Sequence, residues 1–219
     1  MKSFFKVNAF ILSVYLVLFV SGLFLVASYP KADLHLIINQ WHTAFFDNFF
    51  RYVTWLGSGW AVLFLALLFL FFKVKNTVVF LAGNLLITIF VQVGKHIIFP
   101  GALRPITYFK GVHALHLVNG VVMHGYNSFP SGHSATAFGI FVMLIFLIKN
   151  RGLKILWLAI ALLTAFSRVY LSQHFMEDVL AGSFIDTFAM FFTLYYFDRY
   201  FAGCCNCSVL KCFSHKKRI

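Results

Sequence analysis

Charged residues are scarce in this chain of 219 residues. They make up 11% of it, and acids are the rarest, with six Asp and Glu against 18 Lys and Arg. The chain also lacks an internal linker, a low-complexity block and a short repeat, so the sequence predicts a single domain. Apolar residues dominate instead: 61% of residues are hydrophobic and 30 are phenylalanine, more than a compact aqueous core of this size can bury. These proportions exclude an ordinary soluble domain.

The apolar residues gather in runs whose lengths approach the roughly 20 residues that a helix needs to cross a bilayer. Six such runs are present: 7–28, 53–72, 77–94, 134–148, 153–170 and 179–197. The sequence therefore predicts an all-α fold, an integral membrane bundle of six transmembrane helices that forms one domain over residues 1–200. Residues 201–219 follow as a cytoplasmic tail, where zinc binding, acylation and reduced thiols are the alternatives for Cys204, Cys207, Cys212 and His215.

The basic residues predict the orientation of these spans. Lys2 and Lys6 precede a first run longer than the ~7–15 apolar residues of a cleavable signal, which indicates an uncleaved anchor with a cytoplasmic N-terminus. With six spans both termini are cytoplasmic, and twelve basic residues lie inside against six outside. This asymmetry explains most of the net charge of +12, and no nucleic-acid motif accompanies it, so no nucleic-acid partner is expected. The short chain and this pattern predict a bacterial inner membrane protein.

Two segments between the spans are expected on the outer face. Residues 29–52 alternate charged and aromatic side chains, which predicts an amphipathic helix along the membrane interface. Its histidines, His35 and His42, are expected to pack there without a chemical role. Residues 95–131 form a long polar connection, and loops of this length are often functional.

Six antiparallel spans place six helix ends on the outer face, and four of them are the end of the third span, the start of the fourth, the end of the fifth and the start of the sixth. Ionisable residues occur at these ends, although such residues are expensive at the edge of hydrocarbon. We therefore expect them to converge on one pocket at the outer boundary, and the alternative is a buried ion-pair cluster that joins helices. The set comprises Lys95, Arg104, His133, Arg168, His174 and Asp178.

Three members of this set are cations suited to holding a multiply charged oxyanion, and arginine adds bidentate donors. They are Lys95, Arg104 and Arg168. Ser131 and Gly132 come directly before the fourth span, so backbone N–H groups at the positive end of that helix can face an anion. The combination indicates binding of a phosphoryl group.

The two histidines supply acid–base and nucleophilic chemistry. His174 and Asp178 are four residues apart, so on a helix the carboxylate can hold one ring nitrogen and leave the other free. His133 starts the fourth span and can exchange a proton with a leaving group. Arg168, however, lies six residues before His174, about 120° round an unbroken helix. We therefore predict a break: the fifth span ends near Tyr170 and the sixth begins around 174–178.

Three stretches carry a family resemblance. Residues 95–105, the PSGH at 130–133 and the SRVYLSQHFMED at 167–178 resemble the signature motifs of the type 2 phosphatidic acid phosphatase superfamily. That superfamily includes membrane lipid phosphatases and soluble vanadium haloperoxidases. The first motif departs from the usual pattern, because eight residues instead of six separate its lysine from Arg-Pro. Pro100 and Gly101 lie in this spacer, where the extra residues can bulge.

The resemblance implies a role for each matching residue. His174 is the nucleophile that forms a phosphohistidine, Asp178 orients it, and His133 protonates the leaving oxygen. The phosphate oxygens are then held by Lys95, Arg104, Arg168, Ser131 and Gly132. Neither a metal nor another cofactor is required.

The resulting expectation is a membrane-embedded phosphatase whose partner is a phosphorylated membrane lipid and whose site faces the periplasm. The stretched first motif favours lipid A and undecaprenyl pyrophosphate over phosphatidylglycerol phosphate and phosphatidic acid. A protein that only binds or transports an anionic lipid, without catalysis, is the alternative from another class, and a purely structural membrane protein is a third.

Overall fold

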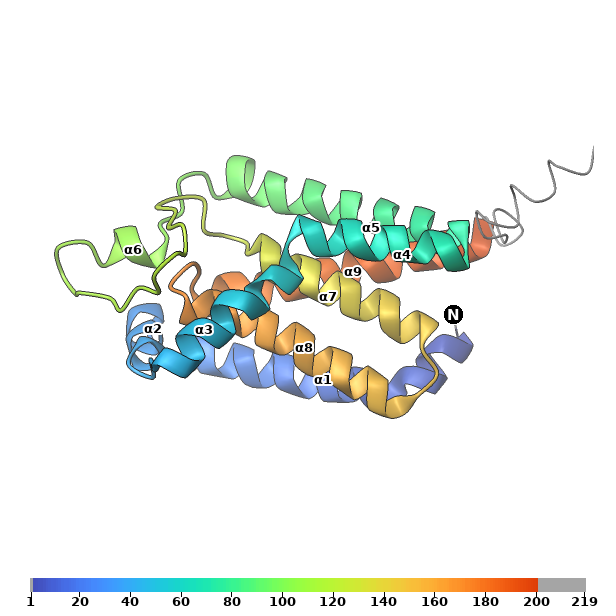
Figure 1. The fold of residues 1–219 in the computed structure, drawn as a ribbon, viewed down its shortest axis with the longest axis horizontal. Helices are drawn as coiled ribbons and strands as arrows, with labels where there is room; N and C mark the ends of the chain where they lie inside the picture. Colours follow the sequence, from blue (N-terminus) through green and yellow to red (C-terminus); the bar gives the residue numbers. More distant parts are fainter. Residues whose placement is uncertain (1, 201–219) are drawn as a thin grey trace, which may run out of the picture.

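The computed structural model describes residues 2–200, and within this range it contains helices and no strands, as the sequence predicted. The helices pack lengthwise into a bundle (Figure 1). In chain order they are α1 Lys2–Ser28, α2 Lys31–Asn39, α3 Ala44–Val53, η1 Thr54–Gly57, α4 Gly59–Phe72, α5 Val74–Val93, η2 Gly94–Ile98, α6 Pro105–Tyr108, α7 Gly132–Leu147, α8 Arg151–Tyr170 and α9 Met176–Tyr200. The tail at 201–219, with its cysteines, lies outside the described residues.

Four of the described helices are long and apolar enough to cross a membrane: Phe5–Ser28, Val74–Ile98, Arg151–Tyr170 and Met176–Phe197. A fifth span arises if the bent pair Ala44–Gly57 and Gly59–Phe72 is taken together. The remaining predicted span is α7, whose 16 residues reach about 24 Å, less than the ~30 Å hydrocarbon core. An all-helical membrane bundle is therefore confirmed, whereas the count of six stays a prediction.

The predicted second span, 53–72, is not one straight helix. The chain bends by 54° between η1 and α4, where Ser58 adopts an extended conformation with ψ 164°. Gly57 ends η1 against the start of α7, and a Cβ atom at this glycine would come within 2.5 Å of the carbonyl oxygen of His133. The bend thus brings α3 and η1 close to the helix start that carries His133.

The predicted interfacial helix over 29–52 is also divided. It forms α2 and α3, and a turn at Gln40–Thr43 separates them. Thr43 caps α3 by accepting a hydrogen bond from the backbone N–H of Phe46 at 3.2 Å, which is the usual role of threonine at a helix N-terminus. Because the turn lets the two short helices run in different directions, they cover more of the end of the bundle than one straight helix would.

The centre of the bundle is α7, which packs against α8 and α9 (Figure 1). Eleven of its 16 residues are buried. Its surface is apolar all round, and a helix of this kind belongs in a core. Gly182 of α9 permits the closest approach, because a Cβ atom there would overlap the carbonyl oxygen of Ser131. The close packing of α9 therefore fixes the position of the start of α7 within the bundle.

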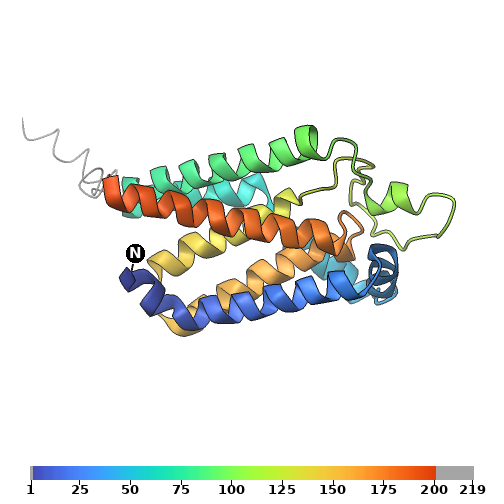
Figure 2. The ribbon, with the colours of Figure 1, turned by 180° about the vertical axis from the view of Figure 1, so that it is seen from behind.

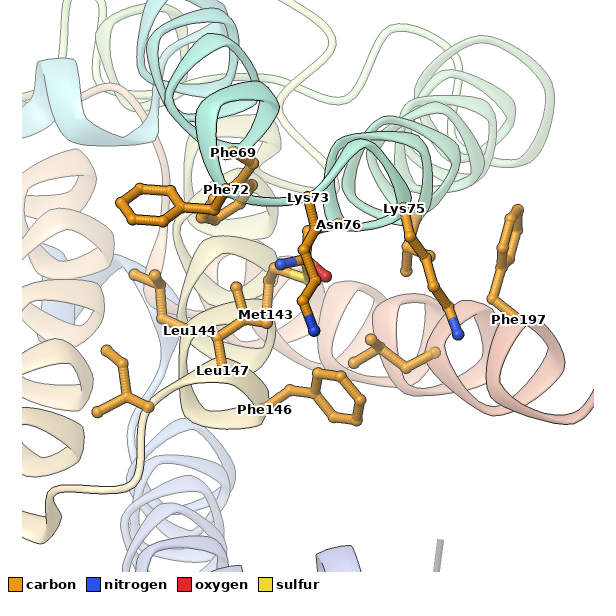
Figure 3. Close-up of a pocket in the computed structure, with 13 residues that line it drawn as sticks. Phe69, Phe72, Lys73, Lys75, Asn76, Met143, Leu144, Phe146, Leu147 and Phe197 are labelled. Carbon is orange, nitrogen blue, oxygen red and sulfur yellow. The ribbon is translucent and has the colours of Figure 1, made fainter. Parts of the chain in front are cut away.

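The two ends of the bundle differ. Figures 1 and 2 show α2, α6 and the long connection before α7 at one end, while α1 begins and α9 ends at the other. Near the second end a cavity of about 680 Å³ is lined mostly by apolar side chains, with Lys73 and Lys75 among them (Figure 3). None of the predicted site residues lines that cavity. The chemistry has to be sought at the first end.

Candidate active site

The predicted break between the fifth and sixth spans is confirmed. Helix α8 ends at Tyr170, α9 begins at Met176, and the residues between them form a tight hinge. The backbone N–H groups of Gln173 and His174 both donate to the carbonyl oxygen of Arg168, at 2.9 Å and 3.1 Å. This folding-back turns the side chains of Arg168 and His174 into one cavity.

His174 is buried and held by a carboxylate. Its Nδ1 lies 3.3 Å from Oδ2 of Asp178, and the two residues are 1% and 2% exposed. The same oxygen accepts hydrogen bonds from the Ser128 hydroxyl at 2.5 Å and from the N–H of Phe175 at 2.9 Å. An ionised carboxylate only accepts, so Nδ1 carries the proton and Nε2 holds the lone pair. The ring is thereby fixed in the tautomer that a nucleophile needs.

The surroundings of His174 also keep it neutral. Burial lowers the pKa of His174 well below its usual value, and the charges of Arg168, Arg104 and Lys95 lower it further. A neutral imidazole is the nucleophilic form. At neutral pH the ring therefore needs no deprotonation before it can react.

Two buried arginines share one partner beside this histidine. Nη1 of Arg104 and Nη2 of Arg168 donate to Oε1 of Gln173, at 3.2 Å and 3.3 Å. Arg168 also donates to the hydroxyl of Thr54 at 2.7 Å, while its buried Nε has no hydrogen-bond partner among the described residues. Such an orphaned donor beside a cavity suits an incoming oxyanion, because an unpaired buried N–H is costly.

Gln173 and Thr54 are site residues that the sequence analysis missed. Gln173 lies inside the third motif, directly before His174, so its position could have drawn attention to it. Thr54 carries no such signal, because it is 114 residues away from the arginine that it contacts. Its role follows only from the bend that brings η1 to α8.

Lys95 lines the same cavity as Arg104 despite the long spacer in the first motif. The helix that carries it ends in the π-helical turn η2, and Gly101 then turns the chain with φ +75°. A π-helical turn accommodates additional residues within a helix and is frequent at functional sites. Both turns lie in or beside the long spacer, and Lys95 lines the cavity together with Arg104.

One predicted ligand lies apart from the others. Ser131 does not line the cavity: its N–H donates to the carbonyl oxygen of Asp178 at 2.9 Å. Its hydroxyl caps α7 by accepting from the backbone N–H of Ser134 at 3.5 Å, and it also accepts from the hydroxyl of Ser134 at 2.9 Å. Ser131 thus orders the helix start, and its hydroxyl keeps its own O–H as a donor, so its role in binding phosphate stays a prediction. Gly132 and His133, the next two residues, do line the cavity.

The cavity has a volume of about 770 Å³ and receives side chains from four regions of the chain. These are α3 with η1, the turn η2, the long connection before α7 with the start of α7, and α8 with the hinge. It contains every predicted site residue except Ser131 and Asp178, which lie directly behind it. The loop histidines do not gather at one point, since His124 lines the cavity while His116 pairs with Asp47 at 2.9 Å.

Comparison with known families adds to this geometry. A model of the PAP2 superfamily matches residues 76–202, more than half of the chain. The chain belongs to the PAP2 superfamily. Together with the lipid phosphatases that it matches, this makes it a phosphatase, a phosphoric ester hydrolase of lipids, and its apolar helices make it an integral membrane protein.

Individual relatives of this PAP2 phosphatase agree with that placement. The lipid A 4'-phosphatase of Bacteroides thetaiotaomicron is 32% identical over 172 residues, 75% of each chain. The crystal structure of Aquifex aeolicus LpxE matches with a TM-score of 0.67 and 26% identity, over 75% of this chain and 94% of that one. A transmembrane PAP2-type phosphatidylglycerolphosphate phosphatase from Bacillus subtilis shares the fold, with a TM-score of 0.63, 23% identity and coverage of 84% and 96%.

One feature of this PAP2 phosphatase was not expected. His35 was predicted to pack at the membrane interface, yet it is 1% exposed, and its Nε2 lies 3.2 Å from the hydroxyl of Ser172 in the hinge. Asn39 donates to the same hydroxyl at 3.2 Å. Ser172 has φ +52°, a conformation that a non-glycine residue holds only with support from its surroundings. Helix α2 thus braces the hinge that presents Gln173 and His174.

Proposed function

We propose that the protein removes phosphate from a membrane lipid, as a phosphate monoester or pyrophosphate, through a phosphohistidine on His174. Lipid A and undecaprenyl pyrophosphate are the foremost substrates, with phosphatidylglycerol phosphate and phosphatidic acid as alternatives. One observation carries the proposal: a neutral, carboxylate-held histidine shares its cavity with three cations, one of which keeps an unpartnered buried donor.

In the first step Nε2 of His174 attacks phosphorus. A nitrogen–phosphorus bond forms and the bond from phosphorus to the lipid oxygen breaks. His133, which takes up a proton when the anionic phosphate neutralises the surrounding cations, donates that proton to the lipid oxygen. Asp178 stabilises the positive charge that develops on the attacking ring. Lys95, Arg104 and Arg168 balance the charge on the phosphoryl oxygens, which is where most of the catalysis of phosphoryl transfer resides.

In the second step water attacks the phosphohistidine. His133, now neutral, takes a proton from the water as the oxygen–phosphorus bond forms and the nitrogen–phosphorus bond breaks. Inorganic phosphate leaves, and both imidazoles return to their starting states. The N–H groups at the start of α7, which follow Ser131, face the anion throughout.

The relatives support the substrate ranking. The 32% identical relative is a lipid A 4'-phosphatase, and the matching Aquifex aeolicus structure, at 26% identity, is LpxE. The phosphatidylglycerolphosphate phosphatase is similar in fold, at 23% identity. Lipid A therefore stands first among the candidates.

The proposed topology has six spans, with α7 as the short central one, both termini in the cytoplasm and the site facing the periplasm of a bacterial inner membrane. Twelve of the 18 basic residues then lie inside, in line with the positive-inside rule. Labelling tests this arrangement: in a chain whose four tail cysteines are replaced, a cysteine at Lys110 should react with an impermeant maleimide in intact spheroplasts. A cysteine at Lys149 should react only after lysis, and the reverse pattern would invert the proposed orientation.

Phosphate release from the four lipids by purified protein tests the function. His174→Ala should abolish turnover while keeping the melting temperature and the binding of the lipid substrate, because only the nucleophile is removed. Full activity in that variant would refute the mechanism, and reversible loss with chelators would contradict metal-free turnover. A protein that binds these lipids but never yields a trapped phosphohistidine would instead be the non-catalytic binder.

A further inference from the structure

The active-site cavity is larger than a phosphate group needs. At about 770 Å³ it has the size of a pocket for a whole small molecule. Its inner part holds the cations and histidines described above. The rest forms what we term the outer wall, which consists of Arg51, Tyr52, Trp55, Gly120, Val121, Val122 and His124. None of these residues has a role in the proposed chemistry.

The outer wall contains a fourth cation, Arg51. It lies in the last turn of α3, three residues before Thr54 and four before Trp55, so the three residues share one face of the helix. Thr54 is the residue that accepts a hydrogen bond from Arg168. Arg51 is therefore displaced from the phosphate site by about one helical turn, or ~5.4 Å.

The loop opposite α3 is shaped around this arginine. Gly120 has φ +77°, which favours glycine, and a Cβ atom there would come within 2.7 Å of Nη2 and 2.9 Å of Cζ of Arg51. The guanidinium thus lies against bare backbone, where a larger residue would displace it. An arginine in the last turn of α3 also interacts favourably with the negative end of the helix dipole. A side chain turned to solvent would have the same interaction, so the dipole does not explain why Arg51 lines the cavity.

No residue that lines the cavity is acidic, and Arg51 forms no ion pair with the described residues. Its described contacts are the Tyr52 ring, 5.9 Å from Cζ, and the loop backbone. The donors of its guanidinium are thus available to oxygen atoms of a bound molecule. Tyr52 and Trp55, 66% and 59% exposed, add two aromatic faces on which the apolar face of a ring can rest.

We propose that Arg51 is a specificity-determining residue, which donates hydrogen bonds to oxygen atoms of a sugar that carries the scissile phosphate. This inference rests on the proposed function and names its substrate class as phosphorylated glycolipids. A glycerol phosphate head group has no ring and does not fill the outer wall once its phosphate is held by the inner cations. A sugar attached to that phosphate extends over the distance that separates Arg51 from Thr54.

Steady-state kinetics on three substrates test this assignment: lipid A, phosphatidylglycerol phosphate and the water-soluble p-nitrophenyl phosphate. For lipid A, Arg51→Gln should lower kcat/KM by about 10- to 100-fold, the effect of losing a hydrogen bond to a charged donor. The loss should appear mainly in KM, because the contact is remote from the reacting atoms. Turnover of the other two substrates should stay at the wild-type level.

Two further variants keep the test sharp. Lys110→Gln removes an exposed cation of the same loop region that does not line the cavity, and it should leave all three substrates unaffected. Gly120→Ala retains the arginine but displaces its guanidinium, so it should reproduce the selective loss on lipid A. Melting temperatures of the variants separate selective loss from misfolding.

The outcomes are distinct. Equal losses on all three substrates in a folded Arg51→Gln protein would place Arg51 in the phosphate clamp and overturn the inference. Unchanged lipid A kinetics in that variant, with an active wild-type enzyme, would overturn the inference alone. A wild-type enzyme inactive on every lipid would overturn both the inference and the proposed function.

Discussion

Acid should destabilise this protein through His35. The ring is enclosed by the aromatic rings of Phe109 and Phe175, whose centroids lie 5.7 Å and 5.3 Å from its own. Its Nε2 contacts Ser172, and its buried Nδ1 has no hydrogen-bond partner among the described residues. Burial lowers the pKa of His35 from 6.5 to about 4, and the nearby charge of Asp178 offsets only part of this effect.

The sign and size of the effect follow from proton linkage. Between pH 6.5 and about 4, His35 is protonated in the unfolded chain and neutral in the folded chain. The free energy of unfolding therefore falls as the pH falls through this interval. At about 1.4 kcal/mol for each pH unit, this interval corresponds to a loss of about 3 kcal/mol. Above pH 6.5 the ring is neutral in both states, and its contribution no longer changes.

Denaturant titrations in detergent micelles, at about pH 7 and about pH 4.5, measure this loss. His35→Gln is the matched control, because an amide fits near Ser172 but does not titrate. Other groups titrate in both proteins, so the difference between the two pH dependences isolates His35. The wild type should lose about 2–3 kcal/mol more than the variant. Equal losses would refute the reasoning, since they would show that His35 takes up its proton without unfolding.

Two other substitutions probe the site through its supports. Vanadate mimics the phosphoryl transition state, and Gln173→Ala should raise the vanadate concentration needed for half-inhibition about tenfold, because both buried arginines lose the amide oxygen that positions them. Gln92→Ala, at an exposed position, is the control. Equal inhibition of the two variants by vanadate would contradict this role of Gln173. Gly57→Ala should lower stability by about 1–3 kcal/mol and reduce activity, since the new methyl group meets the backbone of His133. Gly59→Ala has open space and should be neutral or stabilising, as melting temperatures will show.

Much of the site could be predicted because membrane topology restricts it. Once the spans are counted, parity assigns each polar helix end to one face, and the six-residue interval between Arg168 and His174 requires a break between two helices. The observed hinge lies where that reasoning placed it, between Tyr170 and Met176.

The missed features depend on contacts that periodicity does not encode. A hydrophobic pattern shows which segments are buried, yet not which polar groups meet, so nothing pointed to the pairing of Thr54 with Arg168. The bend at Ser58 lies in a run that is apolar enough overall to predict one span, although Gly57 and Gly59 on either side of Ser58 are residues that can interrupt a helix. His35 stands in an amphipathic segment, where its pattern matches that of an interfacial residue, and only the packing of α2 on the hinge buries it.

The pairing of Arg104 and Arg168 on a single amide oxygen has a consequence for turnover. The site gathers three positive charges, and among the described residues Asp178 is the one acid whose side chain contacts His174. The nearby Glu177 is engaged by Lys31 at 3.4 Å. A bound phosphoryl group relieves the mutual repulsion of these cations, and departing phosphate restores it. Product release therefore works against the same force that attracts the substrate, so inorganic phosphate should act as a competitive inhibitor and its departure should limit the rate.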